Sequence, residues 1–335
     1  MLNDRKKKIL KAVIEEYIHT AEPVSSGSLV KNHGLNFSSA TIRNDMAELE
    51  SDKFLEKPHT SAGRVPSGKG YRYYVDELLK DDNISLEEMQ YIKKKLEIKV
   101  NEMEDLTKIA TDTISEITHY TSLAIGPKME NHNIIDIKFV LLGSRVLMAV
   151  ILTDAGTIKE TLIKFNADIT ESQVESINYI FNQKLRGMPL SKIDKPMQEY
   201  ILSEMNYELK IIKPIIEQIN MELENNSKIY LEGTNRTFEF PEFKSYETAR
   251  KFLKLLDTKD IVLELLNHDF AQDINVYIGD ENDNEDLKDF SIITFKHSVD
   301  GKELGTIGII GPTRMDYSKV ISVMRYINRK LNERK

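Results

Sequence analysis

Apolar residues near the amino end of the chain recur at the spacing of helices that each bury one stripe of side chains. Such a stripe runs through residues 5–19, and after a short second helix a third begins at Ser38, whose hydroxyl is a typical N-cap. In the third helix Ile42, Met46 and Leu49 share one face. The opposite face is small, polar and cationic. It carries Ala40, Asn44 and Ala47, with Thr41 and Arg43 on its flanks.

The segment after the third helix predicts a two-stranded ribbon. Residues 54–57 have the composition of a short strand, residues 59–63 form a polar turn, and residues 64–66 return. Three helices followed by a ribbon form a winged helix, a DNA-binding fold in which the third helix enters the major groove. Three helices alone would fit an ordinary helical bundle equally well, so the ribbon is the feature that favours a DNA-binding domain.

The distribution of charge along the chain supports the same interpretation, because the first 74 residues differ from the chain as a whole. The whole chain has 46 Lys and Arg against 54 Asp and Glu, a net charge of −8 that argues against nucleic acid as a partner. Residues 1–74, however, hold 12 basic against 9 acidic residues, and residues 53–74 hold five cations against one acid. A basic ribbon beside the third helix fits phosphate contacts. The predicted base-reading residues are Ser39, Ala40, Thr41, Arg43 and Asn44. The predicted wing and phosphate contacts are His59, Thr60, Ser61, Arg64, Lys69 and Arg72.

Patterns that would indicate other chemistry are incomplete. Residues 63–69 have the glycine and lysine spacing of a P-loop, but Gly70 stands where a magnesium-binding hydroxyl belongs, and Pro66 lacks a backbone donor. Residues 280–291 begin like a calcium loop, yet lack its central glycine and its final glutamate. The chain has no cysteine, and no catalytic signature is found. We therefore expect no catalytic residue, no cofactor and no bound metal.

Helices and strands alternate beyond residue 83. Ser85 and Glu88 form a capping box, and the apolar positions that follow continue to residue 118, either as one long helix or as two. A helix-rich block between strand-forming segments predicts an α/β domain that is split by an insertion. The strand-like runs are 123–126, 134–142, 146–153, 158–165, 229–232, 274–278, 291–296 and 304–310, and the helical runs are 171–185, 196–224, 246–256, 259–267 and 317–331.

Several short segments near the two ends of the chain are distinctive. They are SSATIRN (38–44), MAELE (46–50), PHTSAGR (58–64), GYRYYVD (70–76) and GTIGIIGPTRMDY (305–317). Together they resemble the signatures of the HrcA family of heat-inducible transcription repressors. Because the signatures lie near opposite ends, the resemblance covers nearly the whole chain.

This resemblance implies a multidomain α/β fold and a set of partners. The expected domains are an N-terminal winged helix-turn-helix (residues 1–78), a discontinuous GAF-like α/β domain (79–188 and 272–335) and an inserted, helix-rich α+β dimerization domain (189–271). The resemblance also implies a homodimer that binds double-stranded DNA. The expected operator is the inverted repeat called CIRCE, upstream of chaperonin and DnaK-type chaperone operons, with the chaperonin as modulator.

Two other classes of function stay open. A metabolite-responsive winged-helix regulator would use the GAF-like domain as its effector site. An enzyme would use the acidic remainder of the chain, although no catalytic motif assembles there. The longest apolar run, residues 146–152, is too short to span a membrane, so we expect a cytoplasmic protein without a membrane partner.

Overall fold

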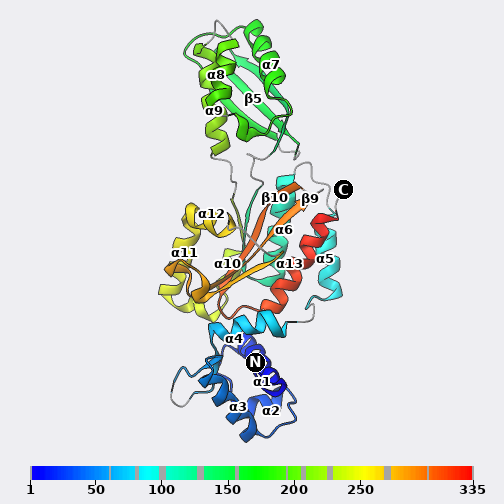
Figure 1. The fold of residues 1–335 in the computed structure, drawn as a ribbon, viewed down its shortest axis with the longest axis vertical. Helices are drawn as coiled ribbons and strands as arrows, with labels where there is room; N and C mark the ends of the chain where they lie inside the picture. The colour runs from blue at the N-terminus through cyan, green and yellow to red at the C-terminus, as the bar shows by residue number, and fades with distance from the viewer. Residues whose placement is uncertain are drawn as a thin grey trace.

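Three structural units follow one another along the long axis of the molecule in the computed structural model (Figure 1). We call them the head (residues 2–79), the central unit (within residues 83–126 and 229–333) and the distal unit (within residues 132–224). The expected mixed α/β class is confirmed. The structure describes residues 2–59, 62–79, 83–97, 103–126, 132–154, 158–193, 195–204, 209–224, 229–267, 273–299 and 302–333.

The head consists of three helices, a two-stranded ribbon and a fourth short helix. Its elements are α1 (Asp4–Thr20), α2 (Ser26–Asn32), α3 (Ser39–Ser51), β1 (Leu55–Glu56), β2 (Val65–Pro66), α4 (Gly68–Tyr73) and the π-helical turn η1 (Tyr74–Leu78). The apolar stripes of the first three helices meet in a buried core that includes Ile9, Leu29 and Ile42. Strands β1 and β2 pair antiparallel, with Leu55 opposite Pro66.

The central unit is a five-stranded antiparallel sheet with helices on both faces. Its strand order is β7-β3-β10-β9-β8. On β9, Ile293 faces α6 and α13, whereas its neighbour Ile292 faces α11 and α12, as alternation along a strand requires. The elements are α5 (Leu86–Leu96), α6 (Met103–Thr118), β3 (Thr121–Ile125), β7 (Ile229–Glu232), α10 (Thr234–Thr237), η4 (Pro241–Lys244), α11 (Tyr246–Asp257), α12 (Lys259–Asn267), β8 (Asn275–Ile278), η5 (Gly279–Glu281), η6 (Glu285–Leu287), β9 (Phe290–Val299), β10 (Lys302–Pro312) and α13 (Tyr317–Asn332).

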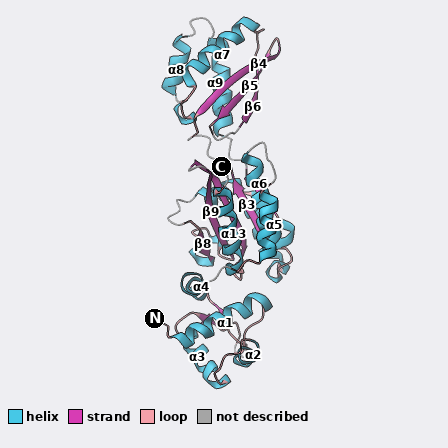
Figure 2. Ribbon diagram, turned by 90° about the vertical axis from the view of Figure 1, so that its right-hand side faces the viewer, coloured by secondary structure: helices cyan, strands magenta, loops and turns pink. Residues whose placement is uncertain are grey.

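The distal unit is a three-stranded antiparallel sheet covered by helices on one face (Figure 2). Its buried positions on β5, such as Leu147 and Ile151, pack in one core with Phe181 and Ile212 from the helices. The elements are β4 (Ile134–Gly143), β5 (Val146–Thr153), β6 (Ile158–Lys164), α7 (Glu171–Leu185), η3 (Leu190–Lys192), α8 (Lys195–Glu204) and α9 (Leu209–Glu224).

These units place the boundaries of the insertion elsewhere than expected. The expectation grouped residues 189–271 as one helix-rich insertion and left β4 to β6 with the GAF-like part. Instead, α8 and α9 share a core with the β4–β6 sheet, whereas β7 joins the central sheet and α11 and α12 pack on it. The cause of the difference is physical, because helical periodicity shows which face of a helix is buried but not which sheet buries it.

Candidate nucleic-acid interface

Helix α3 is held by its cap and by its buried face. The hydroxyl of Ser38 accepts a hydrogen bond from the backbone N–H of Thr41 at 3.1 Å, as expected of the N-cap. Ile42, Met46 and Leu49 are buried against the rest of the head. The opposite side, which we call the outer face of α3, therefore points away from the core.

All five predicted base-reading residues lie in the first half of α3. Ala40, Arg43 and Asn44 are exposed, and Thr41 is half-buried beside the cap. Ser39 is exposed, but its hydroxyl lies 3.0 Å from that of Ser26 on α2. Arg43 and Asn44 make no side-chain hydrogen bond or ion pair with any residue that the structure describes, and their polar groups are thus available to a ligand.

Two ion pairs that the sequence did not reveal orient α3 against α1. Arg5 donates two hydrogen bonds to the carboxylate of Asp45, at 2.7 and 2.9 Å, and Asp45 is only 2% exposed. The hydrogen bond with Asp45 raises the pKa of Arg5. Lys6 pairs with Glu48 at 2.6 Å. Each pair joins residues about forty positions apart, and no local pattern identifies such partners.

The ribbon is fastened to the turn before α2. Val24 and Arg64 exchange two backbone hydrogen bonds, at 2.8 and 2.9 Å. At Gly63 a Cβ atom would lie 2.3 Å from the carbonyl oxygen of Val24, so only glycine permits this close approach. The predicted wing residue His59 is exposed, whereas Thr60 and Ser61 lie outside the described residues.

A hollow of about 380 Å³ opens between α3 and the ribbon. Arg43 and Lys57 line it, together with Ser25, Ala62 and Arg64. Lys57 is exposed and makes no ion pair within the described part of the chain. The predicted contact set omitted this lysine, although its charge was visible in the sequence.

The predicted phosphate contacts Arg64, which lines this hollow, and Lys69 already have partners. Arg64 pairs with Glu50 at 2.6 Å. The ammonium of Lys69 donates to the carbonyl oxygen of Asp52 at 2.9 Å and lies 4.3 Å from the centre of the Phe54 ring. Lys69 is exposed and keeps ammonium donors for a phosphate, whereas Arg64 is half-buried and its charge is already matched by Glu50.

Arg72, the last predicted phosphate contact, faces the central unit instead. Its Nε donates to Glu281 at 2.8 Å, its Nη1 to Asp76 at 3.1 Å, and its Nη2 to the carbonyl oxygen of Val276 at 2.5 Å. These contacts use the guanidinium at the junction between the head and the central unit. We therefore remove Arg72 from the candidate DNA contacts.

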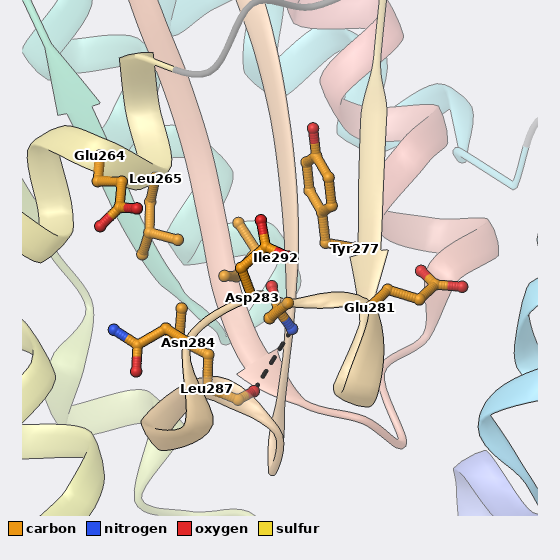
Figure 3. A pocket seen from close by; sticks show the side chains of 9 residues that line it. Glu264, Leu265, Tyr277, Glu281, Asp283, Asn284, Leu287 and Ile292 are labelled. Carbon is orange, nitrogen blue, oxygen red and sulfur yellow. Dashed lines mark hydrogen bonds between the residues drawn. The ribbon is translucent and has the colours of Figure 1, made fainter.

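We next consider a metal site, a membrane span and a small-molecule pocket among the described residues. His, Asp and Glu side chains within the described ranges do not gather into a group of three that would ligate a metal ion. None of the helices that the structure describes has the length and apolar composition of a transmembrane span. A pocket of the central unit, lined by Glu264, Tyr277 and Glu281 among others (Figure 3), has a volume of about 40 Å³. Small-molecule sites usually measure about 300–1,000 Å³, so this pocket is too small for a typical effector. A wider hollow of about 620 Å³ in the same unit is lined by Ile274, Arg325 and Glu333 among others, so the size of the cavities alone does not decide against a metabolite-responsive regulator.

Comparison with known proteins gives consistent matches along the chain. The family model of the HrcA protein C-terminal domain matches residues 104–321. The heat-inducible transcription repressors HrcA of Ruminiclostridium cellulolyticum and Acetivibrio thermocellus are 40% and 39% identical to this chain, over 99% of its length and 97% and 96% of theirs. A crystal structure described as that of a hypothetical protein is similar with a TM-score of 0.70 and 25% identity, covering 99% of this chain and 98% of that one.

Proposed function

The chain belongs to the HrcA family of heat-inducible transcription repressors, and on this premise we propose that its head is a winged helix that binds operator DNA. In this proposal α3 enters the major groove and the β1–β2 ribbon lies along the sugar-phosphate backbone. One observation carries the proposal. Arg43 and Asn44 are exposed and unpaired among the described residues, next to a small side chain, on the outer face of a capped and otherwise buried helix.

The chemistry of these side chains suits base recognition. An arginine fork matches the O6 and N7 acceptors of guanine, and an asparagine amide matches the donor and acceptor of adenine in the major groove. Ser39, Ala40 and Thr41 are short enough to let the helix approach the base edges. We assign phosphate contacts to His59, Lys57 and Lys69 and retain Thr60 and Ser61 from the sequence prediction.

We propose that the protein is a homodimer formed through the open face of the distal sheet. On this face Val140, Met148 and Leu162 stand side by side on β4, β5 and β6, and Leu162 is 55% exposed. Leu142 and Ile158, 56% and 44% exposed, extend the patch. Contiguous exposed apolar surface of this kind marks an interaction site. A twofold dimer would match an inverted repeat, because each head meets one half-site.

The operator and the modulator follow from family membership. We propose that the operator is CIRCE, that the repressed genes encode chaperonin and DnaK-type chaperones in the cytoplasm, and that the chaperonin modulates the repressor. The three-part division into winged helix, GAF-like central unit and dimerizing distal unit is proposed on the same basis, with the boundaries drawn by the cores described above.

Selection of bound duplexes from a random DNA pool at one stated salt concentration tests this function. We expect enrichment of an inverted repeat and stronger binding when chaperonin is added. Salt must be held constant because nonspecific affinity changes steeply with it. Enrichment of no sequence above the starting pool would contradict the proposal. Enrichment of a single, unrepeated site would contradict the dimer but leave the DNA-binding head in place.

A further inference from the structure

The head is attached to the central unit by more than the chain connection. Helix α4 lies between the two units (Figure 2), and the turn η1 follows it along the chain. Tyr71 on α4 and Tyr317 on α13 are both buried, with ring centres 5.5 Å apart. Burial raises the pKa of both phenols. The contact between the units is therefore packed and excludes water, unlike a flexible tether.

Arg314 of the central unit holds the end of α1. It is 6% exposed and lies just after β10. Its guanidinium donates to both carboxylate oxygens of Glu242, at 2.6 and 3.2 Å, and to the carbonyl oxygen of Ile18. Ile18 lies in the last turn of α1, where carbonyl groups lack helical partners and carry partial negative charge. A cation of the central unit thus caps a helix of the head.

Arg72 makes the second attachment, and here the arginine belongs to the head and its partners to the central unit. This residue of the head reaches into the central unit, where it contacts Glu281 through two nitrogens and the carbonyl oxygen of Val276. Glu281 is itself held, because its carboxylate accepts a hydrogen bond from the backbone N–H of Ile278 at 2.9 Å. Figure 3 shows the Glu281 side chain directed away from Leu265 and Asn284, on the outer side of the pocket. A planar guanidinium that binds a held carboxylate through two nitrogens fixes the relative orientation of the two groups as well as stabilising the contact.

We propose that Arg72 and Arg314 are positioning residues that set the orientation of the head on the central unit. Because one arginine holds α1 and the other holds α4, the two attachments restrict rotation of the head in a way that a single contact would not. If the head binds operator DNA as proposed above, its fixed orientation also affects which operators the dimer can bind. Two heads that are fixed in a dimer match one separation and one rotation of the half-sites, so the junction contributes to operator choice without touching a base.

A distance measurement tests the orientation without DNA. The chain has no cysteine, so Lys31→Cys on the head and Lys259→Cys on the central unit supply two unique labelling sites, both exposed. Spin-labelled chains are mixed with a large excess of unlabelled chains, so that electron–electron distances are measured within one protomer. The variants are Arg72→Gln, Glu281→Gln and the charge exchange Arg72→Glu with Glu281→Arg. Lys251→Gln is the control, because Lys251 pairs with Asp289 inside the central unit at 2.8 Å.

We expect one narrow distance distribution for the parent and for Lys251→Gln, a broader one for Arg72→Gln and Glu281→Gln, and a return to the narrow one in the charge exchange. Removing a buried arginine beside Glu242 also destabilises the central unit, so Arg314→Gln is a supporting variant and the Arg72 variants decide the result. A distribution for Arg72→Gln that is as narrow as that of the parent, at the same distance, would overturn the proposal.

Binding to duplexes of altered spacing tests the consequence. The probes are the duplex that the parent protein enriches from a random pool, the same duplex with two base pairs inserted between its half-sites, and a single half-site. The insertion turns one half-site by about 70° relative to the other. We expect the parent to bind the lengthened duplex at least about tenfold more weakly, because one head loses its contacts.

For Arg72→Gln we expect that ratio to fall to about threefold or less, with single half-site binding unchanged, since a freely turning head keeps its base contacts. An unchanged ratio would contradict the positioning role. If the parent enriches no duplex, the proposed function fails, and the distance measurement still decides whether the arginines fix the head.

Discussion

The surroundings of the outer face of α3 differ from the packed parts of the molecule in how positive charge is matched, because Arg5 and Lys6 elsewhere in the head do have acidic partners. In the head, Arg43, Lys53 and Lys57, on or beside the outer face of α3, have no acidic partner among the described residues. In the central unit several cations, exposed and buried, are matched by acids. The pairs there include Lys251 with Asp289, Lys254 with Asp286, Lys319 with Glu88 and Arg314 with Glu242.

This difference shows that the partner of a cation is more informative than the number of cations. The head carries only three more basic than acidic residues in its first 74 positions, a small excess in a chain of net charge −8. Arg72 also belongs to the head, yet it is paired with Glu281 of the central unit and is not free for a ligand. An unpaired cation beside small residues on a rigid helix is the feature that separates the proposed DNA contacts from the structural cations.

The largest expected effect is the loss of the proposed dimer, which would be formed by the distal unit and not by the head. Leu162→Glu places a charge on the proposed dimer face, and a twofold interface counts each substitution twice. At about 2 kcal/mol for each lost central contact, the dimer Kd should rise about a thousandfold. Analytical ultracentrifugation measures the Kd directly. Leu253→Glu, on exposed surface of α11, is the matched control; equal weakening by both variants would remove the distal sheet from the interface.

The central unit should also respond to acid through a buried histidine. Burial lowers the pKa of His297 to about 4 from the ordinary 6.5. Since the unfolded chain binds a proton first, stability contributed by the neutral ring is complete above pH 6.5 and is lost as the pH falls toward 4. The loss should reach about 3 kcal/mol. Denaturant unfolding from pH 7.5 to 4 should show a steeper decline for the parent than for His297→Gln, and parallel curves would refute the assignment.

A smaller but more specific effect is expected at Arg43. Arg43→Ala should weaken binding to the selected duplex by about 1–3 kcal/mol and leave binding to a scrambled duplex nearly unchanged, because a base contact is lost and not a phosphate contact. Fluorescence anisotropy at one salt concentration compares the two duplexes. An equal loss on both would make Arg43 a backbone contact.

The smallest expected effect is at Lys57. Lys57→Ala should weaken binding to selected and scrambled duplexes alike, and should reduce the slope of log affinity against log salt by about one. Lys254→Ala, which removes a cation paired with Asp286 in the central unit, is the control and should alter neither quantity. A salt slope that Lys57→Ala leaves unchanged would show that this lysine does not neutralise a phosphate.

Local features of the fold were predictable from the sequence, and long-range contacts were not. The caps at Ser38 and Ser85 and the buried stripe of α3 depend on residues a few positions apart, and the structure contains them. The pairing of Arg72 with Glu281 joins residues 209 positions apart. No periodicity encodes such a pair, so the sequence alone groups Arg72 with the basic residues of the wing.

The same limit applies to the candidate interface and the domain boundaries. The outer face of α3 followed from helical geometry, whereas the Arg5–Asp45 pair that orients the helix required the packed structure. The helices α8 and α9 were expected as helices, but their membership in the distal core depends on which sheet lies beneath them.

The most direct test of the central claim, that the outer face of α3 reads sequence, is a comparison of base-preference profiles. The parent and Arg43→Ala are each used to select duplexes from the same random pool at the same salt concentration. The account predicts that both enrich the same inverted repeat, but that Arg43→Ala loses its preference at one symmetry-related position in each half-site. Profiles that are identical, or preferences weakened equally at every position, would contradict it.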